Sequence, residues 1–223
     1  MNNTSKRFKA DHMERYRFAS KIAQGKSILD LACGKGYSTQ LFIEAGVSSY
    51  DGVDINEKQL TPASDKYALS DRINYHVGDM CSFNNGKTFD IITCYGIIEH
   101  LENYESAIKN LYSLLNPGGA LLISSPNRQV TSPYCLSIDD KPANKLHAQE
   151  FTPAELLSIL SCSGFSVSKE KVFGQRQRRL YSIRFLNKII QAVLKKWKKS
   201  EGSIVTAVRD KAPEHFIVAA TKV

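Results

Sequence analysis

Glycines and carboxylates near the start of the chain have the spacing of a nucleotide-binding turn. Asp30 stands at the end of a short apolar run, 28–31, and Gly34 and Gly36 follow it. Glycine lets the backbone adopt positive φ and approach a ligand, and Asp30 can accept a hydrogen bond from a ligand ammonium or hydroxyl group. Cys33 lies in the same turn and is predicted to contact the same ligand. A strand, this turn and a helix through residues 40–43 would form the site.

The spacing of this turn separates three classes of nucleotide site. A phosphate-binding P-loop needs Gly-x-x-x-x-Gly-Lys-Ser/Thr, which residues 34–38 lack. A dinucleotide site favours a third small residue where Thr39 stands, and it rarely has an acid as early as Asp30. A dinucleotide site is therefore less favoured but stays open. Residues later in the chain indicate the third class of nucleotide site.

Later acids extend the predicted site toward a ribose and an adenine. Asp54 ends the apolar run 49–55, where a carboxylate can bind both ribose hydroxyls, with Ile55 beside it. The alternative is that Asp54 caps the next helix, although Asn56 is itself a good cap. In the following turn, Asp79 can accept from the exocyclic amine of adenine while Met80 covers the ring.

Apolar periodicity places these residues on a parallel sheet. Short buried runs alternate with helical patterns, and an Asn-Pro-Gly-Gly stretch ends the last of these helices. The predicted strands are 28–31, 49–55, 72–77, 89–94, 120–125 and 165–173, and the predicted helices include 11–24, 57–69 and 104–115. Such alternation predicts an α/β fold with helices on both faces and ligands at the carboxyl ends of the strands.

Length and composition indicate one globular domain. The 223 residues are 42% hydrophobic, and we expect a single domain over 1–223, with a core at 27–173 and a last strand within 214–223. The first ten residues contain no apolar run, so we expect a cytoplasmic protein without a signal or a membrane-spanning start. Five scattered cysteines argue against a disulfide framework and a zinc site.

The ordered series of landmarks resembles the class I S-adenosylmethionine-dependent methyltransferases. The matching stretches are 30–37, 51–56, 78–79, 89–101 and 115–127, and residues 14–16 and 147–151 are similar to a subgroup that includes surface-polysaccharide, small-metabolite and ubiquinone-type O-methyltransferases. The resemblance implies a Rossmann-like, seven-stranded, mostly parallel sheet whose last strand, 215–221, is antiparallel. It also implies S-adenosyl-L-methionine as cofactor, with Tyr95 among the residues that bind it.

Methyl transfer to a hydroxyl needs alignment of the two reactants and a base near strands four and five. His100 and His147 are the candidate catalytic residues, and the structural alternative for each is a hydrogen bond to a loop backbone. Tyr16, Glu99 and Arg128 are candidate acceptor contacts. Some ubiquinone-type relatives bind a divalent metal through an acid three residues before the Glu-His pair. Gly96 occupies that position here, and we predict no metal.

A basic segment follows the sixth predicted strand. Ten of the Lys and Arg residues lie within 171–199 without any acid, so the net charge of +8 leaves 8 − 10 = −2 for the remainder. Residues 176–200 are predicted to insert a cationic amphipathic helix before the last strand, with Trp197 on its apolar side. That helix can pack on the domain or a second subunit, bind an anionic membrane at the inner face, or, less favoured, contact nucleic acid.

The sequence therefore predicts a methyltransferase that acts on a hydroxyl of a small-molecule or glycosyl acceptor, which can be lipid-linked. An RNA methyltransferase that uses the basic segment is the alternative within the class. A nicotinamide-dependent oxidoreductase and a non-catalytic nucleotide-binding module are the alternatives outside it, because landmarks for cofactor binding say little about turnover. The acceptor and the oligomeric state are left open.

Overall fold

The computed structural model describes residues 3–67, 70–176, 205–208 and 212–223. Its described strands form one nine-stranded sheet in the order β3-β2-β1-β4-β5-β9-β7-β8, with β6 paired to β9. In chain order the strands are β1 (Ser27–Leu31), β2 (Ser49–Asp54), β3 (Ile73–Val77), β4 (Phe89–Tyr95), β5 (Leu115–Pro126), β6 (Phe165–Ser166), β7 (Val172–Gln175), β8 (Thr206–Ala207) and β9 (His215–Lys222).

Strand directions confirm the predicted Rossmann-like architecture. The pairs β1-β2, β2-β3, β1-β4 and β4-β5 are parallel. The last strand, β9, is antiparallel to both β5 and β7, as the resemblance implied. The sixth predicted strand, 165–173, is divided into β6, the 3₁₀ turn η2 (Lys169–Lys171) and β7, and the short β8 adds a further edge. The carboxyl ends of β1, β2, β4 and β5 therefore lie along one edge, where the sequence placed the site.

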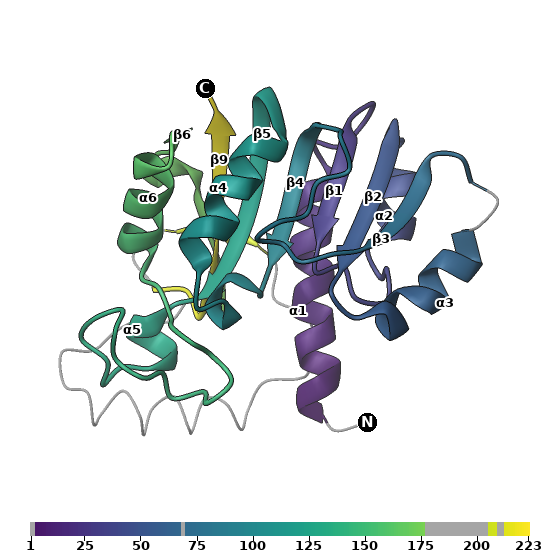
Figure 1. Cartoon of the computed structure of the whole chain (residues 1–223). Helices are drawn as coiled ribbons and strands as arrows, with labels where there is room; N and C mark the ends of the chain where they lie inside the picture. The colour runs from purple at the N-terminus through teal and green to yellow at the C-terminus, as the bar shows by residue number, and fades with distance from the viewer. Residues whose placement is uncertain (1–2, 68–69, 177–204, 209–211) are drawn as a thin grey trace.

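Helices cover both faces of the sheet (Figure 1). On one face, α1 (Asn3–Ser20) and α2 (Thr39–Glu44) pack through Tyr16, Ala19 and Phe42 against Ile28 and Tyr50 of the strands. On the other face, α4 (Tyr104–Leu114) and α6 (Pro153–Cys162) contribute to a second apolar cluster. The central strands are buried on both sides, which explains why their sequences are continuous apolar runs rather than alternating ones.

Local signals set the ends of several helices. Helix α3 (Glu57–Tyr67) begins after Asn56, whose side chain accepts from the Lys58 N–H and thus caps the helix. Helix α6 begins with a capping box between Thr152 and Glu155. Helix α1 differs from the expected 11–24, because it starts at Asn3 and ends at Ser20. The remaining short helices are η1 (Ile98–His100) and α5 (Arg128–Thr131).

Three further observations concern the basic segment, the length and polarity of the helices, and the cysteines. The predicted basic helix lies outside the described residues, apart from Arg176 at its start. In the part of the chain that the structure describes, no helix has the length and apolar character needed to cross a lipid bilayer. All five cysteines are free.

Candidate functional site

The turn after β1 uses its two glycines differently. Ala32, Gly34 and Gly36 all have positive φ, at 59°, 56° and 63°. A Cβ at Gly34 would meet nothing within 4 Å, whereas a Cβ at Gly36 would lie 2.7 Å from the Ala63 Cβ and 2.9 Å from the Tyr75 Oη. The space beside Gly34 is therefore open, and Gly36 allows the turn to pack closely against α3 and β3.

Asp30 does not have the predicted access to a ligand. Its carboxylate is fully buried and accepts from four hydroxyl groups, with two donors on each oxygen. Tyr16 at 3.2 Å and Thr93 at 2.8 Å donate to Oδ1, while Ser38 at 2.6 Å and Tyr50 at 3.0 Å donate to Oδ2. Burial raises the pKa of Asp30 to about 6, and these hydrogen bonds limit the rise. Asp30 thus holds together the elements that surround the glycine turn, through hydrogen bonds to α1, β2, β4 and Ser38.

Asp54 joins the ends of β1 and β2. Its Oδ2 accepts from the Gly34 N–H and its Oδ1 from the Asn56 N–H, both at 2.9 Å. Because Asn56 caps α3, Asp54 is not needed for that role. The Asp54 residue is only partly buried, and each carboxylate oxygen can accept a further hydrogen bond. The neighbouring Ile55 is 72% exposed, an apolar surface beside a polar one.

Cys33 and Met80, which the sequence placed at the ligand, are both buried in the protein. Cys33 is 4% exposed and lies under the turn, where its Sγ would be 2.9 Å from a Cβ at Gly52. Met80 is 7% exposed and belongs to the apolar core, so its side chain does not lie open to cover an adenine. Asp79 is exposed, and its Oδ1 accepts from the Cys81 N–H at 2.7 Å, which leaves its other oxygen facing solvent.

Polar groups meet at the carboxyl ends of β4 and β5. Tyr95 is 4% exposed, and its hydroxyl is buried without a hydrogen-bond partner among the described residues. Next to it, Gly96 has φ of 68°, and a Cβ there would lie 3.2 Å from His12 and 3.6 Å from the Arg15 Nη1. Burial and the adjacent Arg15 lower the pKa of His12 to about 3, so this imidazole is neutral at physiological pH.

Arg15 is a buried cation that the sequence did not predict. It is 1% exposed and donates to two neutral groups, the Gln175 Oε1 at 2.7 Å and the Ser124 Oγ at 3.1 Å. No salt bridge joins it to a carboxylate of the described residues. Burial lowers the pKa of Arg15, and the nearby carboxylates of Glu99 and Asp11 oppose that effect without forming a salt bridge. The available signal was its position four residues from Ala19, on the apolar side of α1.

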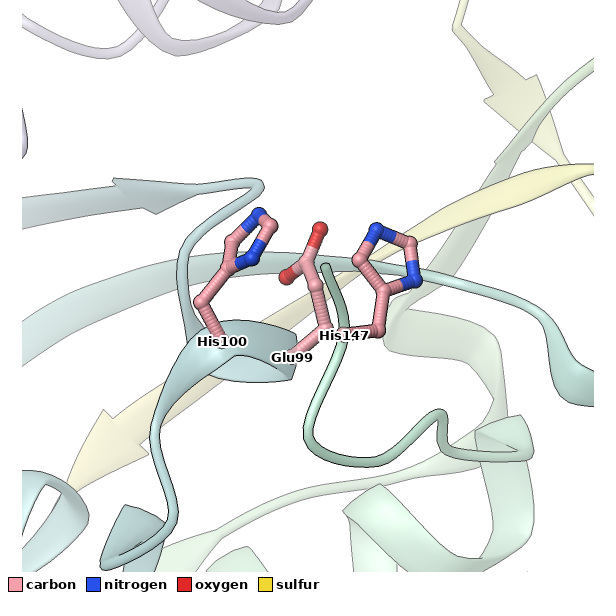
Figure 2. A group of neighbouring side chains, drawn as sticks. All are labelled: Glu99, His100 and His147. Atoms are coloured by element: carbon pink, nitrogen blue, oxygen red, sulfur yellow. The ribbon is translucent and has the colours of Figure 1, made fainter. Parts of the chain in front are cut away.

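Glu99, His100 and His147 meet beyond the end of β4, with Glu99 between the two imidazoles (Figure 2). The ring centroids of His100 and His147 are 5.0 Å apart. His100 Nδ1 donates to the Leu146 carbonyl at 2.8 Å, and His147 Nδ1 donates to the Glu150 Oε1 at 2.7 Å. Glu99 is 4% exposed, and burial raises its pKa. A backbone hydrogen bond and the nearby side chains, among them Arg15, lower the pKa but do not cancel the rise.

The segment that carries His147 is fastened to η1. The Ala148 N–H donates to the Glu99 carbonyl at 2.8 Å, and the Gln149 side chain donates to the carbonyls of Ile98 and Leu101 at 3.0 and 2.7 Å. Glu150, which the sequence did not single out, is buried and binds both His147 and the Thr131 hydroxyl. These bonds connect residues about 50 positions apart and bring both predicted catalytic histidines together.

Two predicted acceptor contacts have internal roles instead. Arg128 is 3% exposed, and its guanidinium donates to the Glu150 carbonyl at 2.8 Å and forms a salt bridge with Glu155. It therefore ties the His147 segment to the start of α6. Tyr16 is 6% exposed, its hydroxyl donates to Asp30, and its ring packs against Tyr95 with centroids 5.2 Å apart. Neither polar group is available to an acceptor.

Several known proteins have sequences similar to this chain. Residues 5–170 match the family model of a methyltransferase domain. A probable S-adenosylmethionine-dependent methyltransferase of Mycolicibacterium smegmatis is 29% identical over 152 residues, which are 68% of this chain and 56% of that protein. A ubiquinone biosynthesis O-methyltransferase of Psychrobacter arcticus is 28% identical over 170 residues, or 70% of this chain and 64% of that protein. The chain thus matches less than two thirds of the length of these relatives.

A solved structure confirms the fold independently. The N-methyltransferase NodS from Bradyrhizobium japonicum, in complex with S-adenosyl-L-homocysteine, superposes with a TM-score of 0.62 over 95% of this chain and 85% of that one. The sequence identity is 14%, so this likeness concerns the fold.

Proposed function

We propose that this chain, which belongs to the family of S-adenosylmethionine-dependent methyltransferase domains, transfers a methyl group to a hydroxyl of a small-molecule or glycosyl acceptor. The observation that carries the proposal is the carboxylate of Asp54 held against the Gly34 N–H at the ends of β1 and β2. A ribose can use the second lone pairs of that carboxylate, and the exposed Ile55 offers an apolar surface to the attached adenine. S-adenosyl-L-methionine contains both groups.

The reaction needs few groups from the protein. The acceptor oxygen attacks the methyl carbon in line, an O–C bond forms, the C–S bond breaks, and its electron pair stays on sulfur to give S-adenosyl-L-homocysteine. The hydroxyl proton must leave for a base. Alignment supplies most of such an acceleration, and a positioned base supplies about 10²–10⁴-fold. The Tyr95 hydroxyl is buried without a hydrogen-bond partner among the described residues, so it offers a hydrogen bond only to a ligand group that enters between the ends of β4 and β5.

His147 has the surroundings of a general base. Its Nδ1 donates to Glu150, so the neutral ring keeps its lone pair on Nε2. Glu150 stays ionised to hold that tautomer: burial tends to raise its pKa, but hydrogen bonds from His147 and Thr131 lower it overall. His100 is held in the same way through the Leu146 carbonyl, and its Nε2 is the second candidate base.

Oxygen is favoured as the methylated atom. The name of the Psychrobacter arcticus relative, an O-methyltransferase of ubiquinone biosynthesis, supports that choice. The alternatives that depend on the basic segment, RNA binding and contact with an anionic membrane, involve residues 177–204 outside the described ranges and stay predictions. The candidate acceptors are therefore hydroxylated small molecules, sugars and lipid-linked glycans.

Turnover of a panel of such acceptors, measured as S-adenosyl-L-homocysteine formed, tests the proposal. We expect hydroxylated acceptors to be methylated in preference to amines. His147→Ala should lower kcat by about 100-fold or more while cofactor affinity is unchanged, because it removes the base and leaves the Gly34 turn intact. His76→Asn is the matched control, since His76 pairs with Asp51 on β2 away from η1. Preferential methylation of amines, or equal losses of kcat and cofactor affinity, would contradict the assignment.

A further inference from the structure

Three side chains beside the predicted acceptor position offer metal-ligand atoms to a common point. Glu99, His100 and His147 each contribute one such atom, and these atoms lie within 4.8 Å of one another. Figure 2 shows the carboxylate of Glu99 between the two imidazole rings, with the three groups directed to the same side. Glu99 and His100 come from η1, and His147 comes from the segment that is fastened to it.

Both imidazoles are prepared to coordinate through Nε2. The partners of the two Nδ1 atoms are the Leu146 carbonyl and the Glu150 carboxylate, which can only accept, so each Nδ1 carries a hydrogen. The lone pair of each neutral ring is then on Nε2. Histidines that bind metals almost always donate their other N–H to a carboxylate or a backbone carbonyl, which orients the ring and raises its basicity. Both kinds of partner are present here.

The contact of Asn144 with His147 agrees with this tautomer. The Asn144 Nδ2 lies 2.8 Å from the His147 Nε2, and an amide nitrogen can only donate. The orientation of that amide is fixed because the Asn144 Oδ1 accepts from the Leu146 N–H at 3.1 Å. His147 Nε2 therefore acts as an acceptor, and a cation that binds there would replace the Asn144 donor.

Glu99 supplies an independent reason to expect a cation. The residue is 4% exposed, and its Oε2 is buried without a hydrogen-bond partner among the described residues. A carboxylate oxygen removed from water without a partner carries a desolvation cost of several kcal/mol. Arg15 acts on Glu99 electrostatically, but it gives Oε2 no hydrogen bond. A metal ion bound between Glu99 and the two Nε2 atoms would supply the missing direct partner.

We propose that Glu99, His100 and His147 bind one divalent transition-metal cation of the zinc class. In the metal-binding pattern of the ubiquinone-type relatives, the third ligand is an acid at the position of residue 96. That residue is glycine here, which is why the sequence predicted no metal. The fold supplies the third ligand from residue 147 instead, 47 positions after His100. Two imidazoles and one carboxylate suit zinc better than magnesium, which prefers an all-oxygen shell.

The side chains need only a small movement to form such a site. Metal–ligand bonds of about 2.0–2.1 Å place the ligand atoms of a tetrahedral site roughly 3.3 Å apart. The ligand atoms of the three side chains lie within 4.8 Å of one another, so each pair has to approach by about 1.5 Å at most. Three protein ligands leave a coordination position open. A cation there would act as a Lewis acid that lowers the pKa of a bound hydroxyl, which relates the site to the proposed O-methylation. With the metal bound, both Nε2 lone pairs are used in coordination, so this lowered pKa would replace the proton removal that His147 performs in the metal-free protein.

Calorimetric titration of the chelator-treated protein, residues 1–223, with zinc tests this inference. We expect one equivalent to bind, with magnesium bound at least 100-fold more weakly. Glu99→Gln and His147→Ala should each weaken zinc binding by at least tenfold. Glu150→Gln, which alters the group that orients His147 and leaves the three ligand side chains in place, should weaken it by about 10–100-fold. His76→Asn, which alters a histidine outside the cluster, should retain full affinity.

Circular dichroism checks that each variant is folded. If Glu99→Gln does not fold, the zinc affinity of Glu150→Gln still tests the inference. Absence of zinc binding, zinc binding unaffected by Glu99→Gln and Glu150→Gln, or magnesium binding as tight as zinc would overturn the inference. Binding of S-adenosyl-L-homocysteine is measured in the same samples. The metal assignment does not depend on that result, so failure of the metal site and failure of the proposed methyltransferase activity are distinguishable.

Discussion

At the scale of single residues, Asp30 has the clearest consequence for stability. Its folded-state pKa of about 6 is above the value of about 3.9 for an unfolded aspartate. The folded state therefore binds more protons between these values, and stability falls as pH rises through this window. A shift of about 2 pKa units corresponds to about 3 kcal/mol.

Asp30→Asn should remove that dependence, because an amide has no charge to bury and the surrounding hydroxyls can turn to accept from it. We predict that the unfolding free energy of the natural chain, relative to Asp30→Asn, falls by about 2 kcal/mol between pH 4 and pH 7, since part of the full effect lies below pH 4. Urea denaturation at a series of pH values measures it. Asp65→Asn, at an exposed position of α3, is the control. Parallel pH profiles for the natural chain and Asp30→Asn would contradict the prediction.

The residue scale also explains what the sequence did not predict. Asp54 is the last residue of β2 and His100 lies five residues after β4, so local patterns located them. The partners of Asp30 come from α1, β2 and β4, as far as 63 positions away, and no local pattern connects them. Glu150 gains its role only because the chain folds back on η1. Asp30 was expected to meet a ligand because its many hydroxyl neighbours were not apparent.

At the scale of elements, the connection between η1, the His147 segment and α6 organises the acceptor side. Arg128 links two of these parts through the Glu150 carbonyl and the Glu155 carboxylate. Hydrogen bonds to charged groups contribute about 1.5–3 kcal/mol each. The strands and the glycine turn were predictable because continuous apolar runs and glycine spacing are local. The division of the sixth strand into β6 and β7 was not, since pairing with β9 decides it.

Arg128→Ala is therefore predicted to destabilise the chain by about 2 kcal/mol and to lower kcat, with little change in KM or cofactor affinity, because the His147 segment loses its support. Arg128→Lys should recover part of the stability. Urea denaturation and steady-state kinetics with any acceptor found to be methylated measure these effects. A raised KM with unchanged stability would restore the direct acceptor contact that the sequence suggested for Arg128.

At the scale of the whole molecule, the sheet divides the site into two halves. The ends of β1 and β2 carry the Gly34 turn and Asp54, and the ends of β4 and β5 carry Tyr95, Glu99 and the histidines. Arg15 reaches this edge from α1. Under the proposed function, the first half would hold the cofactor and the second half would hold the acceptor. This division predicts that changes on one half leave binding to the other unaffected.

Calorimetric titration with S-adenosyl-L-homocysteine tests the central claim most directly, because its binding requires no knowledge of the acceptor. We predict micromolar affinity, about −8 kcal/mol, for the natural chain. Asp54→Ala should weaken binding at least tenfold by removing the acceptor of the ribose hydroxyls, while Glu57→Ala, which removes an exposed carboxylate nearby, should not. No binding heat at two temperatures, or an affinity unchanged by Asp54→Ala, would contradict the account.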